Sequence, residues 1–267
     1  MKSNELWFGS TAQMNDTAEC NHFIDAVLNQ SSQLLGDIEL PGLELIIEQL
    51  RPAIRDDTYI SSWCEYFDVD PDGKLSMWRG YADDGEGVGL VIDSSQLQPS
   101  EITPQKVGFF VYSSKVEYVR EKRVIDLAND YIRRLTTVAD INATLMENLN
   151  MAITLLAKAP CVKHDGFKEE EEVRFLYMRG MRKILGSSRT DEIIKRVGSG
   201  KDSRTFYAFP LLNYTEFDYD LRLSSLLKKI VIGPAKNQEV RANKIRQLLN
   251  HYNLHHVTVE MSNIPYR

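Results

Sequence analysis

The stretch Lys163–Tyr177 constrains the fold more than any other, because it passes from turn residues (HDG) into an alternating strand. Successive side chains on a strand point to opposite faces of a sheet. Val173, Phe175 and Tyr177 therefore share one face, which we expect to pack in the core.

The opposite face of this strand is expected to carry Glu170, Glu172, Arg174 and Leu176. Two interpretations stay open for this charged row. It is either a charged strand end that faces water, or a catalytic Glu-x-Glu pair on a strand that lines a cleft. In both interpretations Glu172 lies away from the apolar core, so Glu172→Gln is expected to keep the fold.

Composition limits the class of protein. The chain has 267 residues, 43% of them hydrophobic, which is enough for a sizeable core, and its net charge of −6 argues against binding nucleic acid by bulk electrostatics, although a local basic groove is not excluded. Cys20, Cys64 and Cys161 lie far apart without metal-ligand spacing, which indicates a reducing compartment and no metal site. No apolar run has the length of a signal peptide or a membrane span, so we expect a soluble, cytoplasmic protein without a membrane partner.

Residue patterns predict an ordered set of helices and strands. Helices are expected over 17–35, 43–50 (ending before Pro52), 190–197 and 237–251, and a helical hairpin over 120–159. Strands are expected over 58–67, 88–92, 108–118 (a pair), 205–212, 228–233 and 256–261. We therefore predict an α+β fold: one domain over residues 1–267 with a mixed, mostly antiparallel sheet and a helical-hairpin insertion at about 120–160.

The segment 75–93 is the second informative stretch. Val88–Ile92 is apolar without alternation, which predicts a central strand buried on both faces, with one face left bare by its glycines. Trp78, Arg79 and Tyr81 come just before it and are either core aromatics beside a surface arginine or a shelf for a ligand. The preceding DVDPDG matches the first half of a calcium loop, but the twelfth position is Arg79 where a glutamate is needed, so no metal is predicted.

Five motifs follow one another along the chain: LWFxSxxxxND at Leu6–Asp16, SMWRxYxxxxxGVxL at Ser76–Leu90, FxxExExR at Phe167–Arg174, IVIGP at Ile230–Pro234 and the ending SNIPYR. In this order they resemble a bacterial family known only as a domain of unknown function, the 2971 family. More distantly, that family is similar to ADP-ribosyltransferases of the DarT-like kind. The resemblance implies a split mixed sheet, NAD as substrate, and a late catalytic glutamate, which would be Glu172 with Glu170 upstream of it.

The chemistry of NAD cleavage suits these residue types. Breaking the nicotinamide–ribose bond develops oxocarbenium-like charge, which a carboxylate such as Glu172 stabilises, while Glu170 orients or deprotonates the acceptor. Arginines would hold the pyrophosphate and aromatic rings would pack on nicotinamide. The expected NAD contacts are Ser10, Asn15, Trp78, Arg79, Tyr81 and Arg174. Arg174 is also expected, by the more ordinary interpretation, to neutralise Glu172 on its own strand.

One departure from these relatives concerns the start of the chain. They often have a strand reading roughly LYxYxS ahead of the LxFxS stretch, whereas here Met1 almost directly precedes it. If that strand is missing, part of the NAD-binding wall is missing too.

The expected function is an NAD-consuming ADP-ribosyltransferase of a toxin or phage-defence system, with a protein or nucleic-acid acceptor. The alternative is a non-catalytic interaction or sensor module of such a system. A metal-dependent nuclease is disfavoured, because no Asp…Glu-x-Lys arrangement surrounds a strand pair.

Overall fold

The computed structural model describes residues 4–14, 17–34, 43–95, 97, 105–107, 111–138, 145–180, 193–215 and 219–265. The chain divides into two compact units, which are described separately below. The small unit comprises Met1–Asn4, Cys64–Leu97 and Leu211–Arg267, and the large unit comprises Glu5–Trp63 and Gln98–Pro210. The predicted α+β class with a mostly antiparallel sheet is confirmed, and the prediction of one domain stays a prediction.

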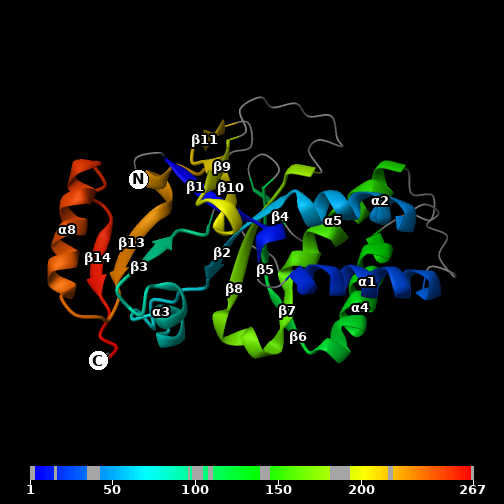
Figure 1. The fold of residues 1–267 in the computed structure, drawn as a ribbon, viewed down its shortest axis with the longest axis horizontal. Coiled ribbons are helices and arrows are strands. Elements are labelled where there is room, and N and C mark those ends of the chain that lie inside the picture. The colour runs from blue at the N-terminus through cyan, green and yellow to red at the C-terminus, as the bar shows by residue number, and fades with distance from the viewer. Residues whose placement is uncertain are drawn as a thin grey trace. The chain divides into compact units, whose positions relative to one another are not determined.

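The large unit contains a seven-stranded sheet with the order β4-β5-β8-β2-β1-β10-β9 (Figure 1). Every pairing with a recorded register in this sheet is antiparallel. The strands are β1 (Glu5–Ser10), β2 (Thr58–Cys64), β4 (Gln105–Val107), β5 (Val111–Lys115), β8 (Glu172–Met178), β9 (Ile194–Val197) and β10 (Arg204–Pro210). A separate short parallel pair joins β6 (Glu117–Val119) to β7 (Val162–His164).

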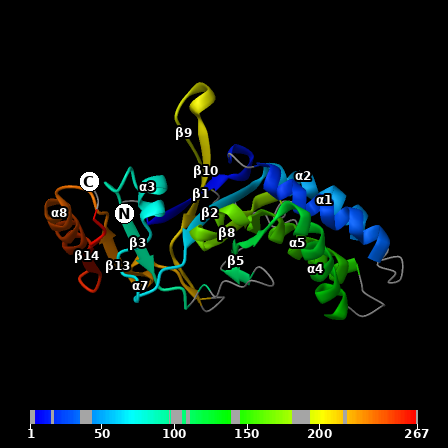
Figure 2. The same cartoon turned by 90° about the horizontal axis from the view of Figure 1, so that it is seen from below.

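Four helices of the large unit gather beside this sheet (Figure 2). They are α1 (Thr17–Leu34), α2 (Leu43–Asp56), α4 (Val124–Val138) and α5 (Leu145–Lys158), and short 3₁₀ turns precede α4 and follow α5. Phe23, Ile47, Tyr131 and Leu156 are buried among them, together with Met178 of β8. The helices therefore cover the sheet face to which the even-numbered residues of β8 point.

Two of the predicted elements in the large unit differ from the structure. Helix α2 continues through Pro52 to Asp56 because its apolar side, with Ile47 and Leu50, is buried, and this packing outweighs the helix penalty of proline. Ile194–Val197 forms strand β9 and not a helix, because it pairs with β10 through Tyr207 and its neighbours. The rest of the predicted helix, residues 190–192, lies outside the described residues.

The small unit is built on a three-stranded sheet with the order β14-β13-β3. Strand β13 (Leu227–Ile232) is parallel to β14 (Thr258–Met261) and antiparallel to β3 (Val88–Ile92). Helix α8 (Gln238–His251) links β13 to β14, as a parallel crossover requires, and packs on the buried side chains of β13. The other elements are α3 (Leu75–Tyr81), α7 (Leu223–Leu226) and the pair β11 (Asn213–Tyr214) and β12 (Tyr219–Asp220).

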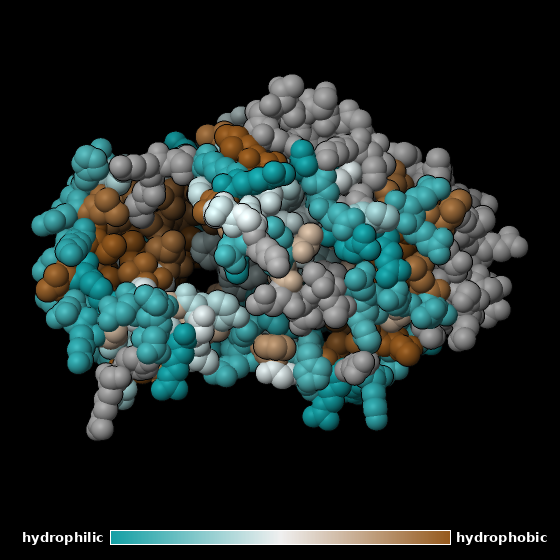
Figure 3. Space-filling view, viewed as in Figure 1, coloured by the Kyte–Doolittle hydropathy of each residue, from teal (hydrophilic) through white to brown (hydrophobic). Residues whose placement is uncertain are grey.

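The prediction of a central strand at Val88–Ile92 is wrong. Among the described strands β3 pairs only with β13 and so lies at the edge of its sheet, with Val88 and Leu90 39% and 46% exposed. Apolar surface gathers over this sheet on the face seen in Figure 3. An unbroken apolar run fits an edge strand as well as a central one when a neighbouring element covers part of one face, so periodicity alone did not distinguish the two.

The IVIGP motif lies at the end of β13, where the turn after this strand comes close to the glycine-rich loop before β3. Gly233 donates its N–H to the carbonyl of Gly87 at 3.0 Å, and a Cβ on Gly233 would lie 2.9 Å from that oxygen and well inside contact with the carbonyl of Gly85. Arg241 of α8 then donates to the carbonyls of Gly233 (2.9 Å) and Ala235 (3.1 Å). The glycine-rich loop before β3 is thus fixed to the turn that follows β13.

Gly233→Ala is expected to lower the free energy of unfolding by about 1–3 kcal/mol, the usual cost of forcing extra volume into a packed site. Gly80→Ala is the matched control, because nothing lies within 4 Å of a Cβ at Gly80 in α3, where alanine also favours the helix. Urea unfolding of both variants measures the difference. Equal stability of the two would contradict the close approach.

Candidate functional site

Glu172 begins strand β8, and Glu170 does not share that strand. Glu170 ends the 3₁₀ turn Asp165–Glu170, and Glu171 adopts a left-handed conformation (φ 44°) that redirects the chain before Glu172. The prediction of Glu170 and Glu172 as alternate residues on one strand is therefore wrong, because the strand starts two residues later. The alternation from Glu172 onward is confirmed, since Tyr177 and Phe175 contact aromatic residues of β2 and β10 on the opposite face.

Arg174 is the ion-pair partner of Glu172. Its Nε and Nη2 donate to Oε1 and Oε2 of Glu172 at 2.8 and 3.1 Å, and its Nη1 donates to the carbonyl of Pro160. This two-point contact fixes the carboxylate plane as well as its position. The expected neutralising role of Arg174 is thus what the geometry supports.

Lys163 of β7 brings Glu170 back to Glu172. Its ammonium lies 2.6 Å from Oε2 of Glu170 and 3.4 Å from Oε2 of Glu172. The ring of Phe167, in the same 3₁₀ turn as Glu170, lies 4.5 Å from this ammonium. The two glutamates therefore meet through a lysine, and not through strand periodicity.

Both members of the central ion pair are buried. Glu172 and Arg174 are 7% and 2% exposed, so this face of β8 neither faces water nor opens widely into a cleft. The helical layer and the turn Ala159–Cys161 cover it, with Cys161 packed against Leu176. The expectation that Glu172→Gln keeps the fold rested on a site away from the apolar core, and burial of this face weakens that basis.

Glu172 is nevertheless held as an anion. Burial raises its pKa, but the hydrogen bonds and charge of Arg174, the hydroxyl of Ser62 and the charge of Lys163 outweigh burial, so the pKa lies below its usual value. The backbone N–H of Glu172 donates to the hydroxyl of Tyr118 at 2.7 Å. Burial, together with the charges of Glu172 and Glu170, raises the pKa of Tyr118 to about 12, so that hydroxyl keeps its proton near neutral pH.

A second ion pair, whose lysine is buried, lies close to the first. Lys158, which is fully buried, contacts Oε1 of Glu117 at 2.7 Å, and its ammonium lies 5.8 Å from the ring of Tyr131. Burial raises the pKa of the Cys161 thiol, and it outweighs the charges of Lys158 and Arg174, which act to lower that pKa. Sequence reasoning missed Lys158, Lys163, Tyr118 and Ser62. The one available signal was a lysine inside the apolar run LLAKAP, since lysine is rarely buried without a partner.

Trp78, Arg79 and Tyr81 belong to helix α3 of the small unit, whereas Glu172 belongs to the large unit, so a cleft shared by them stays a prediction. Trp78 is 6% exposed and donates from Nε1 to the carbonyl of Asp72 at 2.8 Å. Its ring covers Gly89, where a Cβ would meet it at 3.3 Å, so the strand face expected to be bare is occupied. Tyr81 is 70% exposed and Arg79 is exposed as well.

Ser10 ends β1 and is buried, with its side chain on the sheet face opposite to that of Gly9. Asn15 lies outside the described residues. Whether Ser10 contacts NAD stays a prediction.

The DVDPDG turn is bound to the end of the chain. The carboxylate of Asp72 accepts from the N–H and side-chain amide of Asn263 at 2.6 and 3.1 Å, and the Asp72 carbonyl accepts from the hydroxyl of Ser262 at 3.0 Å. The SNIP motif therefore fixes this end of the small unit to the DVDPDG turn. Within the described ranges no group of three or more His, Cys, Asp or Glu side chains is arranged to hold a metal ion.

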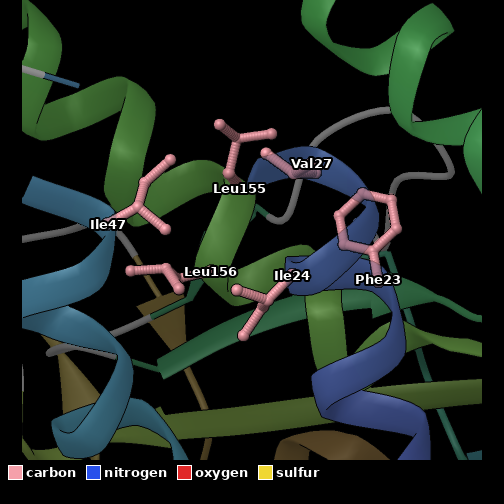
Figure 4. Close-up of a pocket in the computed structure, with 6 residues that line it drawn as sticks. All are labelled: Phe23, Ile24, Val27, Ile47, Leu155 and Leu156. Carbon is pink, nitrogen blue, oxygen red and sulfur yellow. The ribbon is translucent and has the colours of Figure 1, made fainter. Parts of the chain in front are cut away.

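An apolar pocket between α1, α2 and α5 is lined by Phe23, Ile24, Val27, Ile47, Leu155 and Leu156 (Figure 4). These side chains close on one another and leave no room for a water molecule, so this pocket is helix packing and not a ligand site.

Comparison with known proteins gives one match. Residues 77–175 match the family model described as "Protein of unknown function (DUF2971)", which supports the resemblance predicted from the motifs over that part of the chain. The matched segment includes Trp78, Arg79, Glu170, Glu172 and Arg174. No curated protein and no solved structure matches. In the part of the chain that is described, no helix has both the length and the apolar character needed to cross a bilayer.

Proposed function

We propose that this chain is an NAD-consuming ADP-ribosyltransferase, with Glu172 as the carboxylate that acts on the nicotinamide ribose. The observation that carries the proposal is an ionised glutamate held in a fixed orientation by Arg174, with both hydrogen bonds shorter than 3.2 Å. Such a group stabilises positive charge that develops at the ribose without having to reorganise during the reaction. The proposed reaction needs no metal ion.

The weakest contact of Glu172 suggests how a ribose would reach it. Lys163 lies 3.4 Å from Glu172 but only 2.6 Å from Glu170. A ribose hydroxyl that takes over the longer contact leaves Lys163 paired with Glu170 and leaves both Arg174 bonds intact. Ribose binding at this point therefore leaves every charged side chain with an ion-pair partner.

In the reaction the bond between nicotinamide nitrogen and ribose C1′ breaks, and its electron pair leaves with neutral nicotinamide. An acceptor nucleophile forms the new bond to C1′ and gives up a proton to Glu170, whose side chain is 16% exposed. The acceptor is a protein or a nucleic acid. A role in a bacterial toxin or phage-defence system is part of the same proposal.

The test is incubation of the purified chain with NAD, with chromatographic measurement of nicotinamide. Release of nicotinamide above the spontaneous rate is expected. Labelled NAD supplied with a protein extract in one arm and with purified nucleic acid in another identifies the acceptor class by the fraction that becomes labelled. Absence of nicotinamide release in every arm would overturn the proposal.

The second candidate is a non-catalytic interaction or sensor module. One observation in its favour is the charge balance of the network, in which three cations pair with three carboxylates. Another is that the Glu172 carboxylate already has cationic partners in this network. In this case the network only fixes β6, β7 and β8 to the end of α5. The module predicts no nicotinamide release from the wild type or from any variant of the network.

A further inference from the structure

The outer part of the seven-stranded sheet carries an exposed tryptophan next to a half-buried phenylalanine and a lysine. Trp7 of β1 is 43% exposed, and its ring lies 5.6 Å from that of Phe206 on β10. The ammonium of Lys195 on β9 lies 4.9 Å from the Trp7 ring and pairs with Glu5. Large aromatic side chains placed together on an exposed sheet face are unusual unless they contact something.

This aromatic pair lies on the same sheet face as Glu172. Gly9 pairs directly with Ile60, and alternation along β1 and β2 puts Trp7 on the face of Gly9 and Ser62 on the face of Ile60. The hydroxyl of Ser62 hydrogen-bonds the carboxylate of Glu172. Trp7, Ser62 and Glu172 therefore share one face of the sheet, on the strands β1, β2 and β8 that follow one another in its order.

Part of this face is open to solvent. Ser62 is exposed, and a Cβ on Gly9 would meet nothing closer than 3.9 Å. Beyond Trp7 two basic side chains, Lys195 with its partner Glu5 and the exposed Arg204, point to this face by the register of β9 and β10. A flat apolar ring next to positive charge is complementary to a heteroaromatic base that carries a phosphate.

We propose that Trp7, Phe206 and Lys195 form a nucleotide-binding site in which a base stacks on Trp7 and a phosphate pairs with Lys195. Without a nucleotide, Lys195 pairs with Glu5 and its ammonium lies over the Trp7 ring. When a nucleotide binds, the phosphate replaces the Glu5 carboxylate as the partner of Lys195, and the base replaces the ammonium over the ring. Nε1 of Trp7 also donates to Glu5 at 3.2 Å, so Glu5 keeps a hydrogen bond when Lys195 leaves.

The choice of a nucleotide rests on the proposed function, since NAD carries two such bases and the acceptor includes nucleic acid as one class. The shared chemistry is one base and one phosphate, whether they belong to free NAD or to a nucleic-acid strand. Binding is measured without turnover, so failure of catalysis and failure of this site give different results.

Calorimetric titration of the full chain with AMP, with NAD and with an oligoadenylate of about ten nucleotides tests the site and distinguishes the sources. Trp7→Ala is expected to weaken binding by about tenfold, the lower range for losing one stacked base, while Trp7→Phe retains most of it. Lys195→Gln also weakens binding, and its effect grows as the salt concentration falls, because the substitution removes a phosphate contact. Phe67→Ala, which removes an exposed aromatic ring of the small unit, is the matched control and is expected to leave binding unchanged.

The outcomes separate as follows. Trp7-dependent binding of AMP and NAD supports the site with a free nucleotide as ligand, and Trp7-dependent binding that is much tighter for the oligoadenylate supports it with a strand. Trp7-dependent binding without any nicotinamide release supports the site and removes the proposed function. Binding that is unaffected by Trp7→Ala, or no binding of any probe at millimolar concentration, overturns the site.

Discussion

Replacing Glu172 by glutamine is expected to lower nicotinamide release by roughly a hundredfold or more, the scale of losing one electrostatic contact in the transition state. Glutamine keeps the shape of the side chain and removes its charge, so the substrate still fits while the developing oxocarbenium loses its counter-charge. The rate is measured at saturating NAD to separate it from weakened binding. Unchanged release from the folded variant would remove Glu172 from the mechanism and move the role to Glu170.

The same substitution also disturbs stability, so it needs two controls. Glutamine leaves the guanidinium of Arg174 buried beside a neutral amide, which costs free energy of unfolding. The double variant Glu172→Gln/Arg174→Met removes both charges and is expected to recover stability but not activity. Glu169→Gln, in the exposed part of the preceding 3₁₀ turn, is expected to change neither.

The sequence was sufficient for the class of the fold and for many element bounds. Residue patterns located α1, α8 and β13 to within one residue at each end. Alternation in β8 correctly assigned Phe175 and Tyr177 to a common face. Such patterns depend on residues that are close together in the sequence, so they can be predicted without knowing the rest of the fold.

The errors arose where distant parts of the chain decide the outcome. Strand β3 is at the edge because of how β13 and β14 are ordered, and no feature within Val88–Ile92 encodes that order. The polar face of β8 is buried because the helical hairpin and its following turn pack on it, which alternation cannot predict. Lys163, whose ammonium joins Glu170 and Glu172, lies on β7, and β7 pairs in parallel with β6, a segment far from it in the sequence.

Arg174→Met is expected to lower the free energy of unfolding by about 3–5 kcal/mol at neutral pH, because Glu172 is then a buried carboxylate without its main partner. Lys163 and Ser62 remain near it, but the ammonium is the more distant contact and already pairs with Glu170. Urea unfolding followed by circular dichroism measures the loss.

The control is a pair with the same geometry at the surface. Nε and Nη2 of Arg222 donate to the carboxylate of Asp220 at 2.9 and 2.7 Å, and the two residues are again two positions apart in the sequence. The arginine side chain is 53% exposed, however. Water replaces the lost partner there, so Arg222→Met is expected to cost far less than Arg174→Met. Similar losses in the two variants would mean that burial is not what makes the Glu172–Arg174 pair important.

The pH dependence of the difference identifies Glu172 as its source. In the wild type the pKa of Glu172 in the folded state lies below its ordinary value of 4.5, so its contribution to stability is complete above that value and is lost as pH falls through the folded pKa. In Arg174→Met the burial that Arg174 had opposed raises this pKa, so the folded variant takes up a proton more readily than the wild type. Protonation removes the unpaired buried charge, and the stability gap between variant and wild type should therefore be widest near neutral pH and narrow as pH falls through about 4–5. A gap that stays constant from about pH 7 to about pH 4 would show that lost packing of the arginine stem, and not the orphaned Glu172 carboxylate, destabilises the variant.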